Sequence, residues 1–188
     1  MGLRDALFGR KKLSEPREDR LFALTTAAVT LQTELGLTSS GAAAISFKPQ
    51  SSGEFRSAFD DVDQLLEAVA QQSGSKIERK SDEYGFDWIV VDDPDLEDLV
   101  TTAHALADEL TAKGFGSQLL AAMFRFKGGE HPVYWIYGFK RGAYWPFVPI
   151  GDQKRDNATE LELKAKLERE LPIEQDLTRW LAIFDAPV

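Results

Sequence analysis

The sequence predicts an α+β fold, in which an antiparallel sheet is packed with helices. Three observations predict it. The helical and extended segments do not alternate regularly, as they would in a parallel α/β fold. The connections between the extended segments in 118–148 are short, which favours antiparallel pairing. The apolar fraction of 43% in 188 residues is enough for one core. We expect residues 1–18 to form a basic amphipathic tip and linker, and 19–188 a single domain.

The first half of the chain begins with a predicted helix from residue 19, where leucines recur at helical spacing and Gly36 is the stop. Residues 41–48 are short and apolar and end before a proline, which predicts a strand. A second amphipathic helix is expected to open at Ser51-Ser52-Gly53 and to end at Gly74.

Two strands and a third helix follow. Residues 76–80 and 86–91 are predicted to be strands around a turn at 82–85, and the second is rich in aromatic and β-branched residues. Asp93-Pro94 predicts a helix start with Asp93 as the N-cap and proline in the first helical position. Gly114 is expected to close this helix.

Three more strands are predicted at 118–126, 133–139 and 143–148. Pro146 cannot donate a backbone hydrogen bond, so the last of them should lie at the edge of the sheet.

The last part of the chain is predicted to be helical. A helix is expected at 156–171, with Asp156 or Asn157 as its cap and Glu160 paired with Lys164 one turn later. A short helix should follow Pro172.

Charge and composition exclude several classes of function. The formal net charge is −9, which opposes binding to nucleic acid in the absence of a large basic patch. There is no cysteine, so there is no disulfide, thiolate metal site or thiol nucleophile. No apolar run is long enough to span a membrane, and the start lacks the pattern of a secretory signal. We expect a cytoplasmic protein, with peripheral contact to the inner face of the membrane as an option.

Motifs for catalysis and metal binding are missing from the sequence. His104 and His131 lie in different predicted elements, and no paired-histidine motif occurs. The acidic run 92–98 is explained by a helix start rather than a cation site. No nucleophile elbow is present. The prediction is therefore no metal, no cofactor and no enzymatic activity. A carboxylate-dependent enzyme using Asp87, Asp156 or Glu160 is the weakest alternative.

Aromatic residues gather on the two strands at 133–139 and 143–148. Side chains alternate between the faces of a strand, so both faces of this part of the sheet are apolar. One interpretation is a core covered on both sides; the other is an exposed aromatic groove for a partner helix or peptide. The candidate partner-binding residues here are Trp135, Tyr137, Phe139, Lys140, Arg141, Tyr144 and Trp145.

The first twelve residues carry four basic side chains against one acidic one, a net charge of +3, which leaves −12 on the rest of the chain. Leu3, Ala6 and Leu7 have helical spacing. One interpretation is a frayed terminus, and the other is a small amphipathic anchor on an anionic membrane or a partner. The candidate contact residues are Leu3, Leu7, Phe8, Arg10, Lys11 and Lys12.

An ordered series of short motifs runs along the whole chain. It includes Met-Gly-Leu-Arg-Asp-Ala-Leu-Phe-Gly-Arg at the start, Trp88-Ile-Val-Val91, Tyr137-Gly-Phe-Lys-Arg-Gly142 and Pro146-Phe-Val-Pro149. In this series the chain resembles the actinobacterial B-type proteins that are associated with phage shock protein A. The resemblance implies an accessory role in the envelope-stress response, beside a membrane-associated phage-shock-A-type protein. It implies no catalytic residues.

The leading hypothesis is therefore a non-enzymatic adaptor that binds a phage-shock-A-type partner. A chaperone-like module that binds peptides is the alternative. The sequence leaves the oligomeric state open.

Overall fold

The computed structural model describes residues 20–188. Its elements follow the predicted order of helix, strand, helix, two strands, helix and three strands, and this confirms the α+β class. The described residues share one hydrophobic core. The helices are α1 (Ala23–Leu35), α2 (Gly53–Ser73), α3 (Leu96–Ala112) and α4 (Asn157–Leu167). The strands are β1 (Thr38–Phe47), β2 (Lys76–Ser81), β3 (Asp87–Asp92), β4 (Leu119–Lys127), β5 (Val133–Gly138), β6 (Ala143–Phe147), β7 (Pro149–Gly151) and β8 (Lys154–Arg155).

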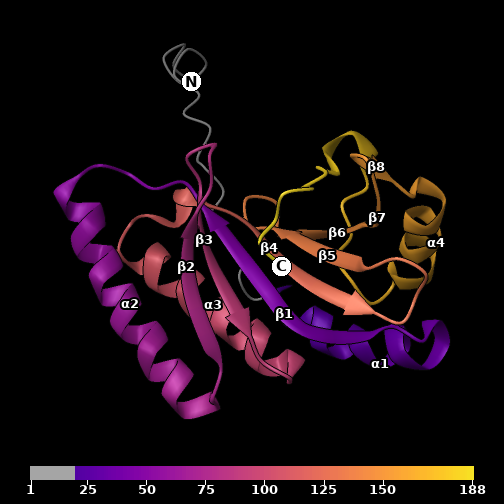
Figure 1. Ribbon diagram of the computed structural model, residues 1–188, viewed down its shortest axis with the longest axis horizontal. Helices are drawn as coiled ribbons and strands as arrows, with labels where there is room; N and C mark the ends of the chain where they lie inside the picture. Colours follow the sequence, from indigo (N-terminus) through magenta and orange to yellow (C-terminus); the bar gives the residue numbers. More distant parts are fainter. Residues whose placement is uncertain (1–19) are drawn as a thin grey trace, which may run out of the picture.

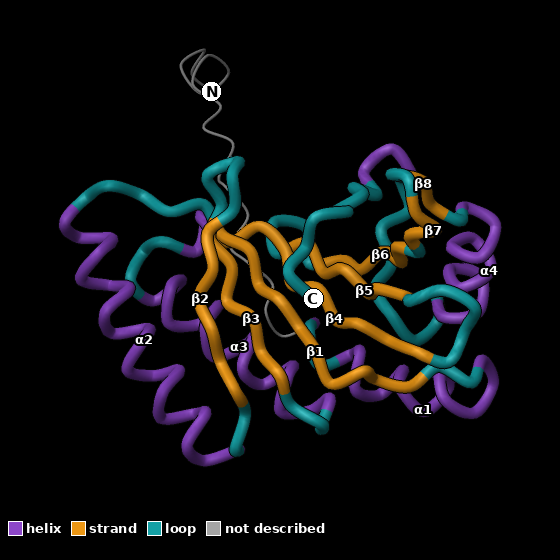
Figure 2. The backbone as a smooth tube through the Cα atoms, in the orientation of Figure 1, coloured by secondary structure: helices purple, strands orange, loops and turns teal. Residues whose placement is uncertain are grey.

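Six strands form one antiparallel sheet in the order β2-β3-β1-β4-β5-β6. Strand β6 lies at an edge, as Pro146 predicts. Helices α1, α2 and α3 lie behind the sheet in Figure 1, whereas the C-terminal segment, drawn in yellow, crosses in front of it. Figure 2 shows the same layers, with the loop that leads to the C-terminus over β4 and β5. The two faces of the sheet are thus covered by different parts of the chain.

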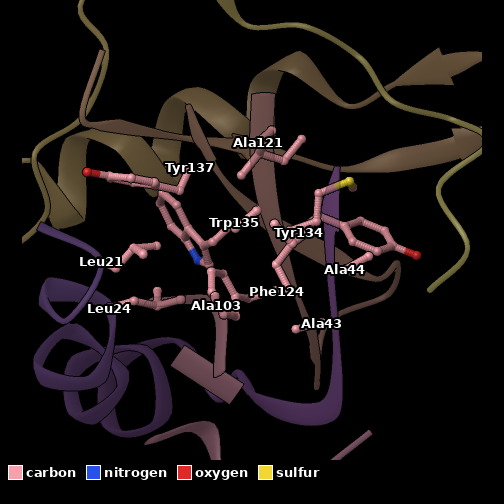
Figure 3. Close-up of a cluster of buried hydrophobic side chains, with 14 of the residues drawn as sticks. Leu21, Leu24, Ala43, Ala44, Ala103, Ala121, Phe124, Tyr134, Trp135 and Tyr137 are labelled. Atoms are coloured by element: carbon pink, nitrogen blue, oxygen red, sulfur yellow. The ribbon is translucent and has the colours of Figure 1, made fainter. Parts of the chain in front are cut away.

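Alternation along the strands separates the side chains of these faces. On the helix-facing side, Phe47 stacks on Phe59 of α2 with ring centroids 4.8 Å apart, and the Tyr144 hydroxyl donates to the Leu21 carbonyl at 2.6 Å. In Figure 3, Trp135 and Tyr137 point towards Leu21, on the side opposite to Tyr134. This is the alternation expected of neighbouring residues on one strand.

Local capping explains most helix ends. The Ser52 side chain accepts from the Phe55 backbone N–H and starts α2, and Gly36 ends α1 in the left-handed conformation with φ of 66°. The predicted N-cap of α3 is wrong by two residues. The helix is capped by Asp95, whose side chain accepts a hydrogen bond from the Glu97 backbone N–H. Asp93 is instead buried, and its carboxylate accepts from Ser75 Oγ at 2.5 Å and from the Asp95 N–H at 2.8 Å.

The part of the chain after β6 differs most from the prediction. A small two-stranded sheet of β7 and β8 precedes α4, and it was not expected. Helix α4 starts at the predicted Asp156 cap but ends at Leu167, before Pro172. The short final helix is a single 3-10 turn, Leu177–Arg179. The segment after it is an irregular chain that packs on the sheet, so its structure depends on tertiary contacts rather than on helical propensity.

Among residues 20–188, no helix is long and apolar enough to cross a bilayer.

Candidate functional site

A large groove opens on the face of the sheet away from α1 and α2, and the C-terminal end of α3 contributes Thr111 to its lining. Its volume is about 1150 Å³. Strands β1, β3, β4, β5 and β6 contribute to the lining. The rest comes from the β2–β3, β5–β6 and β7–β8 turns, from the segment between α3 and β4, and from the C-terminal segment. We call residues 177–188 the C-terminal strap, because this segment crosses that face and forms one wall.

Apolar side chains line much of the groove. Trp88 and Trp145 are almost fully buried, 5% and 4% exposed. Three further apolar lining residues are exposed: Tyr84 at 65%, Leu120 at 39% and Leu181 at 62%. Exposed large apolar side chains that gather around one concave surface are typical of a binding site.

The Asp82 carboxylate fixes one end of the groove. It accepts from the Trp88 Nε1–H at 2.8 Å and from the backbone N–H groups of Tyr84 and Phe86, each at 2.9 Å. Partial burial would raise the pKa of Asp82, but these hydrogen bonds outweigh it and hold the pKa below its usual value. The ionised carboxylate therefore holds both the turn between the strands and the indole of Trp88.

The Trp145 indole joins the sheet to the strap. Its Nε1–H donates to the Leu181 carbonyl at 3.0 Å. Gly138 makes room for the ring, since a Cβ there would lie 2.9 Å from Trp145 Cζ3. Farther along the strap, Phe184 packs edge-on against Phe147, and the Tyr134 hydroxyl donates to the Val188 carbonyl at 3.0 Å. These contacts set the position of the groove's wall.

The two ends of the groove carry opposite charge. At one end, the negative charges of Glu83 and Asp185 raise the pKa of Tyr84, so acidic groups lie near that side chain. At the other end lie Lys140 and Arg141 of the β5–β6 turn. Arg141 also pairs with Glu174 at 3.4 Å.

The predicted aromatic site is divided between the groove and the core. Trp145, Lys140 and Arg141 line the groove. The other four aromatic candidates are fully buried on the helix-facing side, which corrects their assignment to a partner-binding surface. They are Trp135, Tyr137, Phe139 and Tyr144. Helices cover that face, so the interpretation of a covered core holds for these four residues.

The other candidate contact residues are those of the tip. Leu3, Leu7, Phe8, Arg10, Lys11 and Lys12 lie outside the described residues.

The three carboxylates of the enzyme hypothesis have separate partners. Asp87 binds Arg79 and Ser81, Asp156 caps α4, and Glu160 binds Arg155. The prediction that Glu160 pairs with Lys164 is wrong, because its side chain turns into the core and is 1% exposed. Within the described part of the chain, no three His, Asp or Glu side chains are grouped closely enough to hold a metal ion.

Comparison with known families identifies the chain. The model of the family PspA associated protein B matches residues 1–188. The chain belongs to that family. This confirms the resemblance seen in the sequence motifs. No curated protein and no solved structure matches the chain.

Sequence reasoning missed most of the groove of this PspA associated protein B chain. Tyr84, Trp88 and Leu120 lie in or beside different strands, and Leu181 lies in the strap. Alternation of side chains along the strand 86–91 could have placed Trp88 and Asp87 on opposite faces of the sheet. No sequence pattern shows that the strap crosses the same face.

Proposed function

We propose that this chain is a non-enzymatic adaptor of the bacterial phage-shock response that binds PspA through the groove. Membership of the PspA associated protein B family supports PspA as the partner. The observation that carries the proposal is the gathering of exposed Tyr84, Leu120 and Leu181 around one concave apolar surface. In this proposal the chain acts in the cytoplasm, beside PspA at the inner face of the membrane.

The shape and chemistry of the groove support a helical or extended segment of PspA as the bound element. Burial of apolar side chains supplies most of the affinity of such segments, and charged residues at the rim fix their orientation. The acidic end near Tyr84 and the basic end at Lys140 would together select one direction of the bound segment.

Capture of PspA by purified variants tests this proposal. Leu181→Asp and Leu120→Asp place a charge in the groove and are expected to weaken binding of PspA at least tenfold. Val29→Asp on α1 and Leu161→Asp on α4 are matched controls, since their side chains are 64% and 46% exposed and lie outside the groove. The controls should bind as the wild type does.

The proposal is overturned if both groove variants fold and bind PspA with wild-type affinity. Circular dichroism and thermal unfolding of each variant establish that it is folded. If the groove variants instead lose binding to unrelated unfolded peptides as well as to PspA, the chaperone-like alternative replaces the adaptor.

A further inference from the structure

We propose that the groove has an internal ligand, the chain's own residues 2–12. Leu3, Leu7 and Phe8 would cover its exposed apolar side chains, and the basic residues 10–12 would lie near its acidic end. These residues are outside the described part of the chain, so the inference comes from the groove, from the point where the described chain starts and from the sequence of the tip.

The described chain starts beside the groove. Arg20 Nη1 donates to the Gly142 carbonyl at 3.3 Å. Gly142 closes the β5–β6 turn, in which Lys140 and Arg141 line the basic end of the groove. Residues 9–19 span at most about 40 Å when extended, so the tip can reach around the end of the sheet to the opposite face. A short tether gives the tip an effective concentration in the millimolar range, so weak contacts are sufficient.

The chemistry of the tip matches that of the groove. Leu3, Ala6 and Leu7 have the spacing of one helix face, and Phe8 extends it. Residues 1–12 have a net charge of +3, whereas the rest of the chain has −12. The groove offers exposed Leu120 and Leu181, and acidic Asp82, Glu83 and Asp185 lie at the Tyr84 end. Apolar burial and charge complementarity therefore act in the same direction.

A tip in the groove would compete with a partner. This consequence rests on the proposed function: the tip shields the groove until PspA displaces it. Removing the apolar contacts of the tip should then strengthen the capture of PspA, whereas the groove variants weaken it. If the tip instead binds PspA directly, removing its apolar side chains should weaken the capture of PspA.

Paramagnetic relaxation in the full chain tests the inference without PspA. The chain has no cysteine, so Gly9→Cys gives a single site for a nitroxide label. We expect the amide signals of Leu120 and Leu181 to lose at least half their intensity relative to the reduced label. The signals of Val29 and Leu161, exposed elsewhere, should keep theirs. Unaffected groove signals, or equal losses at all four sites, would overturn the proposal.

Two controls complete the experiment. In the labelled chain, Leu7→Asp with Phe8→Asp should restore the intensity of the groove signals. The second control tests for contact between two copies of the chain. Isotope-labelled chain without a nitroxide, which gives the observed signals, is mixed with nitroxide-labelled chain of natural isotope content. Loss of groove signals in that mixture would mean that the tip binds a second copy, which overturns the internal form. Because PspA is absent from this experiment, the proposal of an internal ligand can be overturned while the proposal that PspA binds in the groove still stands.

Discussion

Arg155 holds the buried carboxylate of Glu160, with Nε 2.9 Å from each carboxylate oxygen. The same guanidinium donates to the Trp180 carbonyl at 2.7 Å, and the Val148 N–H donates to Glu160 Oε1 at 2.8 Å. One ion pair therefore links α4, the small β7–β8 sheet and the C-terminal strap. Burial raises the pKa of Glu160, and the hydrogen bonds from Arg155 and Val148 oppose the increase without cancelling it.

Arg155→Met should lower the free energy of unfolding by about 3–5 kcal/mol, because it leaves the Glu160 charge buried without its partner. The double variant Arg155→Met/Glu160→Met should lose less free energy of unfolding than Arg155→Met and Glu160→Met lose together. Because the folded-state pKa of Glu160 is above the unfolded value, its contribution to stability is present at low pH and is lost as pH rises through the folded pKa. Arg155 lowers the pKa of Glu160, so removing Arg155 raises that pKa further, and protonation then relieves the unpaired buried charge at a higher pH. The loss of stability in Arg155→Met should therefore be smaller at pH 5 than at pH 7. Urea unfolding measures all three variants, and additive losses would contradict the coupling.

Asp156→Ala should destabilise the fold at pH 7, because the carboxylate caps α4. The Thr159 hydroxyl and the backbone N–H groups of Thr159 and Ala158 lower the pKa of Asp156. A lowered pKa gives stability that is present above the unfolded pKa and is lost as pH falls through the folded pKa. The difference in free energy of unfolding between Asp156→Ala and the wild type should become smaller below about pH 4.

Asp156→Asn is the matched control for that experiment. Asn keeps an acceptor oxygen for the helix N–H groups, so it should lose less stability than Ala. It cannot ionise, so its stability should depend less on pH than that of the wild type. Urea unfolding at pH 7, 5 and 3 checks both variants, and a constant difference between Asp156→Ala and wild type would contradict the assigned role.

Gly128→Ala should cost about 3 kcal/mol in the free energy of unfolding. Gly128 has φ of 122°, and a Cβ there would lie 2.1 Å from the Gly36 carbonyl oxygen at the end of α1. The variant combines backbone strain with a backbone clash. Gly85→Ala is the control, since φ is 82° but no atom lies within 4 Å of the added Cβ. It should cost only about 1 kcal/mol, and equal losses in urea unfolding would contradict the close approach.

Tyr144→Phe should cost about 1–2 kcal/mol, because the buried hydroxyl donates to the Leu21 carbonyl at 2.6 Å. Tyr134→Phe removes a hydrogen bond to the Val188 carbonyl that is only partly buried, where water can replace the lost donor, so it should cost less. Thermal unfolding compares the two. Amide hydrogen exchange at the start of α1 should also become faster in Tyr144→Phe but not in Tyr134→Phe. Unchanged exchange there would argue against a stabilising role of the hydrogen bond from Tyr144 to Leu21.

The main elements could be predicted from the sequence because their determinants are local. Apolar spacing and the glycines at 36 and 74 define α1 and α2, and the Ser52 cap opens α2. Alternation of side chains is enough to assign opposite faces to Tyr134 and Trp135. Local rules are less certain where several acidic residues compete for one cap. Asp93 failed as the predicted cap because its carboxylate is held by Ser75, far away in sequence.

The candidate site was only partly predictable. The aromatic strands and the turn at Lys140 and Arg141 attract attention in the sequence, and Trp145 does line the groove. Trp135 and Tyr137 look equally suitable in the sequence but lie on the other face, under α1. Which of two apolar faces remains accessible depends on the elements that cover them, and this is not encoded in the strands themselves.

The sequence by itself determined the α+β class, the order of the main elements, the missing cysteine chemistry and the family. These follow from composition, short-range periodicity and ordered motifs. Only the tertiary structure decided that the strap crosses the sheet, that Glu160 pairs with Arg155 instead of Lys164, and that Trp145 meets Leu181. The reason is physical: those contacts join distant segments, and their geometry is set when the core closes rather than by the propensity of any one segment.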